Sequence, residues 1–147
     1  MESRFNFGLQ KLLDIRIEKE EESKRTFQTA QREKIKAEER LTTLQSSYDK
    51  YNRIEKNETV ITKKIKKNYL NALTITIDDA EKELENKDAH LIKCREDLKN
   101  KQIDRKTVEI IKEKKYNEFI NEQNLMEQKQ NDEFALYAFI RKNIERR

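Results

Sequence analysis

Residues 70–98 read LNALTITIDDAEKELENKDAHLIKCREDL, and apolar side chains recur in them at alternating steps of three and four residues. The positions of this stripe, of which only Lys87 is polar, are Leu70, Leu73, Ile77, Ala80, Leu84, Lys87, Leu91, Cys94 and Leu98. Such a heptad spacing places one apolar stripe along a helix and holds it against a partner helix. The stretch is too polar for a membrane span and has the wrong period for a strand. We therefore expect one helix of a coiled coil, with its partner in the same chain.

The composition also indicates long helices and not a compact core. The 147 residues include one glycine, Gly8, and no proline, although the turns of globular domains draw on both. Charged residues make up 42% of the chain and apolar residues 34%, which suffices for a seam but not for a large core. Regular heptads argue against the disorder that such polarity otherwise favours. The predicted fold class is all-α, with two long helices forming an antiparallel coiled-coil hairpin.

A second heptad stripe precedes the first and supplies the expected partner. Its positions are Phe27, Ala30, Lys34, Ala37, Leu41, Leu44, Tyr48 and Tyr51. Projected backwards, the same frame passes through Leu13 and Leu9, and projected forwards it meets only acidic residues beyond Tyr51. The seam of the first helix is therefore predicted to end near Tyr51.

The polar stretch 52–62 separates the two stripes and is the predicted turn, with Asn57 or Thr59 capping the helix that follows. Ser3 or Asn6 is a candidate cap for the first helix. The prediction is a single coiled-coil domain over residues 1–147, with a helix at about 4–55, a hinge at about 56–62 and a helix at about 63–144.

A rival turn lies at Leu73–Asp79. The run Thr74–Ile77 is β-branched and therefore poor for a helix, and an aspartate after it offers a new cap. A turn there divides the chain into equal halves and places Phe5 and Phe7 against Phe134–Ile140. We favour the earlier turn because the heptad phase passes through Leu73–Asp79 unbroken.

The favoured turn fixes an approximate register. It places Leu41 roughly opposite Ile77, Phe27 opposite Leu91, and Leu9 near residues 108–111. The second helix is then longer than the first, and everything beyond about Tyr116 overhangs. The overhang contains Phe134–Ile140, an apolar run that covers all sides of a helix and needs burial by a partner protein or, with the rival turn, by the N-terminal phenylalanines.

No catalytic, metal or cofactor constellation is present in the sequence. The one histidine, His90, flanks the seam, and the one cysteine, Cys94, sits on it, as a buried reduced thiol of a cytosolic protein would. No phosphate-binding glycine loop and no N-terminal signal-peptide pattern occur. We expect a protein that is not an enzyme, with no cofactor, no metal and no small-molecule substrate.

The net charge is +4, and basic and acidic residues are interspersed along the chain. Lys63, Lys64, Lys66 and Lys67 form the one tight basic cluster. A solvated helix end explains this cluster better than a phosphate site does, because nucleic-acid binders usually concentrate basic residues on one face. A nucleic-acid-binding coiled-coil arm is kept as an alternative from another functional class.

Three motifs together resemble the FliJ family of flagellar type III export proteins. They are Phe5-x-Phe7-x-Leu9-x-x-Leu12-Leu13-x-x-Arg16, Tyr69-Leu70-x-x-Leu73-x-x-x-Ile77 and Asn131-Asp132-Glu133-Phe134-Ala135. Their order, their spacing and the chain length fit the family over essentially the whole chain. The resemblance implies a component of flagellum biogenesis, and hence of motility and chemotaxis, that is similar to the central stalk of rotary ATPases.

The resemblance also implies partners and a location. The partners are a hexameric export ATPase, the membrane export gate protein and export chaperones, with no nucleic acid. The location is the cytoplasm, with peripheral association at the cytoplasmic face of the inner membrane at the flagellar base. The equivalent stalk protein of a virulence-type secretion system is the closest alternative.

Two sets of contact residues follow. The export-gate set carried over from the family is Arg40, Leu44, Tyr48, Tyr51, Tyr69 and Leu73. The ATPase-ring set, placed on the apolar overhang, is Phe134, Tyr137, Phe139, Ile140 and Arg141. Tyrosine clustering near the turn supports the first set, since interfaces favour tyrosine, although Tyr48 and Tyr51 also fit plain seam positions.

Overall fold

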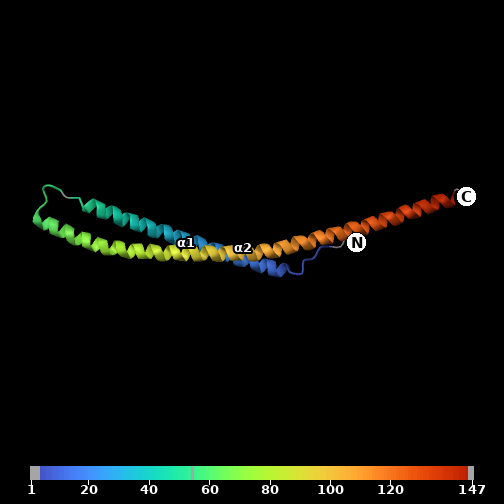
Figure 1. Cartoon of the computed structure of the whole chain (residues 1–147), viewed down its shortest axis with the longest axis horizontal. Coiled ribbons are helices and arrows are strands. Elements are labelled where there is room, and N and C mark those ends of the chain that lie inside the picture. The colour runs from blue at the N-terminus through green and yellow to red at the C-terminus, as the bar shows by residue number, and fades with distance from the viewer. Residues whose placement is uncertain (1–3, 54, 146–147) are drawn as a thin grey trace. The chain divides into compact units, whose positions relative to one another are not determined.

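Two long helices make up most of the chain in the computed structural model, which describes residues 4–53 and 55–145. Helix α1 spans Gln10–Tyr51 and α2 spans Val60–Ile144 (Figure 1). No strand occurs in the described ranges, and the predicted all-α hairpin is confirmed. The chain forms two compact units, Glu18–Gln102 on the one hand and Met1–Ile17 with Ile103–Arg147 on the other. The prediction of a single domain stays a prediction.

The unit Glu18–Gln102 is held by the two predicted stripes. Its buried apolar residues are Ala30, Ala37, Leu73, Ala80, Leu91 and Cys94, all at predicted seam positions. Ala30, Leu91 and Cys94 form one cluster, against which Phe27 packs, as the predicted pairing of Phe27 with Leu91 requires. Small side chains at the seam allow the two helix backbones to approach closely, since each knob fills a hole between four residues of the facing helix.

Ion pairs and hydrogen bonds across the seam fix the antiparallel register. Lys34 Nζ lies 2.6 Å from Asp88, Lys87 Nζ lies 2.8 Å from Glu33, and the Ser23 hydroxyl donates to Asp97 at 2.7 Å. Lys34 and Lys87 are the polar members of the two stripes, and these partners explain how the seam accepts them. Exposed pairs of this kind add little stability, so their main effect is on register.

The rival turn at Leu73–Asp79 is wrong, because α2 runs through it without a break. The hydroxyls of Thr74 and Thr76 donate to the carbonyls of the residues four positions earlier, each at 2.9 Å. This bonding satisfies the threonine side chains inside the helix. Leu73 is meanwhile buried in the seam, and this packing outweighs the weak helix propensity of the β-branched run.

The helix ends differ from the prediction by several residues. Helix α1 begins at Gln10 and not near residue 4. The candidate cap Asn6 lies within a non-helical stretch, and the other candidate, Ser3, lies outside the described residues. The connection occupies 52–59 and not 56–62, and α2 starts at Val60. Thr59 does cap α2 as predicted, because its hydroxyl accepts the Thr62 N–H at 3.3 Å.

Residues 4–9 form a non-helical N-terminal strap that packs on α2. Phe7 is buried in a cluster with Leu13 and Val108. The Phe5 ring lies 5.3 Å from the Tyr116 ring in an edge-to-face arrangement and 5.6 Å from the Phe119 ring. These tertiary contacts stabilise a non-helical backbone at residues 4–9 more than helix formation would. Helix α1 therefore begins only at Gln10. They also exclude the alternative in which Phe5 and Phe7 cover the apolar run at 134–140.

Helix α2 extends beyond the strap contacts as the predicted overhang, which starts after Phe119 and so slightly later than expected. Every residue from 124 to 145 is exposed. None of the described helices has an apolar stretch long enough for a membrane span.

Candidate partner-binding surfaces

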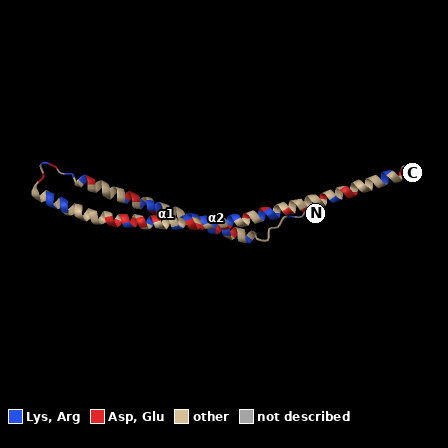
Figure 2. Cartoon of the chain, in the orientation of Figure 1, with Lys and Arg blue, Asp and Glu red and all other residues tan. Residues whose placement is uncertain are grey.

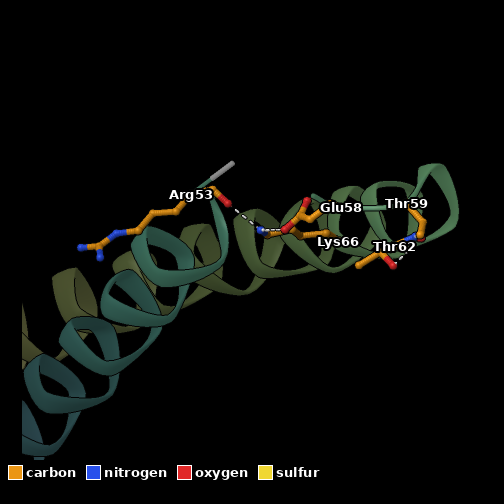
Figure 3. A network of polar contacts seen from close by, with 5 residues as sticks. All are labelled: Arg53, Glu58, Thr59, Thr62 and Lys66. Carbon is orange, nitrogen blue, oxygen red and sulfur yellow. Dashed lines mark hydrogen bonds and ion pairs between the residues drawn. The ribbon is translucent and has the colours of Figure 1, made fainter. Parts of the chain in front are cut away.

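The connection between α1 and α2 is tied down by one lysine. Lys66 Nζ donates to the Arg53 carbonyl at 2.5 Å and to Glu58 Oε1 at 2.6 Å (Figure 3). Both side chains of the Lys66–Glu58 pair are largely shielded from solvent. The Thr59 and Thr62 hydroxyls hydrogen-bond to each other at 2.8 Å at the start of α2. Lys66 therefore links Arg53, which follows α1, to Glu58, which precedes α2.

An aromatic pair lies beside this network. The rings of Tyr51, at the end of α1, and Tyr69, on α2, meet edge to face at 5.0 Å between centroids. Tyr51 is 41% exposed and Tyr69 is 45% exposed. A cavity of about 510 Å³ lies against both rings and against Ile65. Each tyrosine ring therefore contacts the other on one side and is exposed to solvent on the other. Exposed tyrosine rings offer the amphipathic contact area that interfaces favour.

The remaining residues of the predicted export-gate set are less available. Arg40 Nη1 lies 2.8 Å from Glu83 across the seam, Leu44 and Tyr48 are half-buried, and Leu73 is buried. Within the set, the structure brings together Tyr51 and Tyr69, far apart in sequence, as one exposed feature. We define the hinge surface as Tyr51, Tyr69 and the adjacent Ile65.

If the hinge surface contacts a partner, replacing Tyr51 and Tyr69 with alanine weakens binding to the cytoplasmic part of the export gate by roughly tenfold or more, because aromatic anchors dominate interface energies. The measurements are a binding titration and circular dichroism on the same protein. The matched control replaces Ile75 and Ile92, which are also exposed on α2, with alanine. Loss of helicity in step with loss of binding would mean that the tyrosines act only in the fold.

The C-terminal surface consists of the predicted ATPase-ring set: Phe134, Tyr137, Phe139, Ile140 and Arg141. All five are exposed, and no other described residue covers their run. A shallow cavity of about 380 Å³ is lined by Phe134, Tyr137 and Arg141. Leu136 and Ile144 are equally exposed and extend the same surface. Apolar side chains on every side of a helix indicate a partner that surrounds it.

Sequence reasoning missed a third set of exposed apolar residues. Val60, Ile61 and Ile65 lie in the first turns of α2 and are largely exposed. A signal was available, because the heptad frame projected back from Leu70 passes through Lys66 and Lys63 and leaves these three residues off the seam.

The shifted pKa values belong to exposed ion pairs. A hydrogen bond from Lys87 and its charge lower the pKa of Glu33, and the same contact raises the pKa of Lys87. Asp88 likewise raises the pKa of Lys34. His90 Nε2 lies 3.6 Å from the buried Cys94 Sγ on the same helix. In the described part of the chain, no group of three or more side chains is arranged to hold a metal ion.

One comparison with known proteins gave a match. The family model described as flagellar FliJ protein matches residues 5–144. The match spans the strap, both helices and nearly all of the overhang. No curated protein and no solved structure matches the chain.

Proposed function

The chain belongs to the FliJ family of flagellar proteins, and on that premise we propose that it is the stalk-like subunit that couples the export ATPase to the export gate. Family membership makes it a coiled-coil component related to flagellar export, and we propose that it has no enzymatic activity of its own. The proposal adds three tasks to this: promoting assembly and activity of the hexameric ATPase, contacting the membrane export gate, and escorting export chaperones.

The observation that carries the proposal is the C-terminal surface. Monomeric proteins rarely expose contiguous apolar surface of this density unless it is used. The central pore of a hexameric ring surrounds a single helix on all sides, which is what Phe134, Tyr137 and Phe139 together require. Arg141 and Lys142 follow in the last turn of α2 and suit acidic groups or carbonyls that line such a pore.

The hinge surface supports the second half of the proposal. It is a different surface in a different compact unit, so one subunit offers two separate binding sites. We propose that Tyr51 and Tyr69 meet the cytoplasmic part of the gate. The protein then acts in the cytoplasm and associates peripherally with the inner membrane at the flagellar base. The flagellar family match favours this role over the equivalent stalk protein of a virulence-type system.

Co-purification from the source cell tests the proposal. We expect the tagged full-length chain to retain a hexameric ATPase and the export gate protein, and the ATPase to be lost when Phe134 and Tyr137 are both replaced with serine. Replacing the exposed Gln128 and Gln130 with serine is the matched control. Retention of neither partner by the full-length chain, with the helices intact by circular dichroism, would contradict the proposal.

A further inference from the structure

The net charge of the chain is concentrated in one short segment. Residues 49–67 contain seven basic and three acidic residues, which leaves 26 of each sign in the rest of the chain. The whole excess of +4 therefore lies at the connection and in the first turns of α2. Figure 2 shows basic residues in blue along these first turns, whereas acidic and basic residues both occur farther along α2.

Three lysines of this segment are free to meet a ligand. Lys66 is occupied by Glu58 and the Arg53 carbonyl. Lys63, Lys64 and Lys67 are exposed, and none of the described residues pairs with them. Elsewhere in the unit Glu18–Gln102, lysines such as Lys34 and Lys87 are neutralised across the seam. The segment thus presents uncompensated positive charge and not a network of ion pairs.

Aliphatic side chains stand among these lysines. Val60 is 83% exposed, Ile61 is 73% exposed and Ile65 is 65% exposed. Ile61, Ile65 and Tyr69 are spaced by four residues and so share one face of α2. Lys66 and Leu70 are half-buried on the side that faces α1. The exposed face is accordingly apolar, and free lysines border it.

We propose that the first two turns of α2 bind the surface of an anionic lipid bilayer. Basic amphipathic helix segments bind such surfaces by combining attraction to lipid phosphates with burial of apolar side chains at the boundary between headgroups and acyl chains. Lys63, Lys64 and Lys67 supply the charge, and Val60, Ile61 and Ile65 enter the boundary.

The aliphatic residues decide between a lipid surface and nucleic acid. Phosphates of either kind would attract the lysines. Nucleic acid gains from aromatic stacking and charge, and it would leave Val60, Ile61 and Ile65 in water. A fluid bilayer accepts branched aliphatic chains without a shaped pocket. The lipid contact shares Ile65 with the hinge surface but uses neither Tyr51 nor Tyr69 as an anchor, so variants of Lys63, Lys64 and Lys67 test it apart from the proposed gate contact.

Vesicle co-sedimentation of the full chain tests the charge component. We expect binding to vesicles of equimolar phosphatidylglycerol and phosphatidylcholine, weakened by added salt, and little binding to phosphatidylcholine alone. Each lysine near an anionic surface contributes about fivefold in affinity. Replacing Lys63, Lys64 and Lys67 with glutamine therefore lowers affinity about a hundredfold. The matched control replaces Lys82, Lys93 and Lys99, which are exposed on the same helix, and leaves binding unchanged.

A second variant tests the apolar component. Replacing Ile61 and Ile65 with serine lowers affinity for the anionic vesicles roughly tenfold by removing buried area, whereas serine at Ile75 and Ile92 does not. Circular dichroism verifies that each variant stays helical. Equal binding to neutral vesicles, or equal losses in the control variants, would overturn the proposal. Binding to a short DNA duplex without binding to vesicles would overturn it as well and assign the lysines to nucleic acid.

Discussion

Leu91→Asp is expected to lower the free energy of unfolding by about 3–5 kcal/mol. Leu91 is buried in the cluster with Ala30 and Cys94, and Phe27 packs against that cluster. Aspartate there removes the apolar contacts and places an unpaired carboxylate between two helices, where water does not reach it. A two-helix protein has few other buried contacts, so we expect the hairpin to lose most of its cooperative structure.

The adjacent residue provides a matched control for this variant. Ile92 is about half exposed on the same turn of α2, and Ile92→Asp introduces the same charge with the same helix propensity. We expect it to cost less than about 1 kcal/mol, as surface substitutions usually do. Urea denaturation followed by circular dichroism at the helix band gives both values. Similar midpoints for the two variants would refute the assigned seam.

The seam could be predicted from sequence because helical periodicity is a local signal. Alternating steps of three and four residues determine which side chains share a face, and every seam residue named in residues 70–98 is buried or half-buried. The same heptad pattern predicts that the connection follows Tyr51. It also predicts a continuous helix through Thr74–Ile77, despite the poor helix propensity of that run. Both predictions need only the heptad positions along the sequence and no knowledge of contacts between distant residues.

The strap could not be predicted in the same way. Phe5 and Phe7 lie outside α1 because they pack on Tyr116, Phe119 and Val108 of α2. These partners lie more than a hundred positions away in the sequence. Six residues are too few to carry a periodic signal that competes with such tertiary contacts. Helix α1 therefore begins later than the sequence alone predicts.

The ion-pair partners were also beyond sequence reasoning. The chain has 33 basic and 29 acidic residues, so each lysine has many possible partners. Identifying Asp88 as the partner of Lys34 requires a helix register accurate to one residue. Aligning the two heptad stripes across the predicted turn gives the register only approximately. Of the candidate sites, the apolar run at 134–140 could be identified, because an all-round apolar helix is visible in sequence. The heptad frame already leaves Val60, Ile61 and Ile65 off the seam, and the structure shows that α1 does not cover them.

Truncation after Lys129 is the second change with a large expected effect. It removes the whole C-terminal surface and leaves the seam residues and the strap contacts at Tyr116 and Phe119 in place. We expect the truncated chain to stay folded, with a denaturation midpoint close to that of the full chain, yet to lose all stimulation of the export ATPase. Circular dichroism with urea checks the first expectation.

A variant of the full-length chain shows whether stimulation depends on the side chains of the C-terminal surface or on the length of α2. Phe134→Ser combined with Tyr137→Ser keeps the full chain and removes the two most exposed aromatic rings of the C-terminal surface. We expect at least a tenfold rise in the concentration needed for half-maximal stimulation, since aromatic anchors carry most interface energy. Gln128→Ser combined with Gln130→Ser is the control and should match the unchanged chain. Unfolding of the truncated chain would mean that residues beyond Lys129 serve the fold.

The rate of ATP hydrolysis by the purified hexameric export ATPase, measured against the concentration of this chain, shows whether the C-terminal surface activates the ring. Full-length protein should raise the rate to a plateau, as a subunit that enters the ring and stabilises its active form would. Protein truncated after Lys129 should leave the rate at its basal value at every concentration. Equal stimulation by the full-length and truncated chains, or a flat response to both, would mean that the C-terminal surface is not the contact that activates the ATPase.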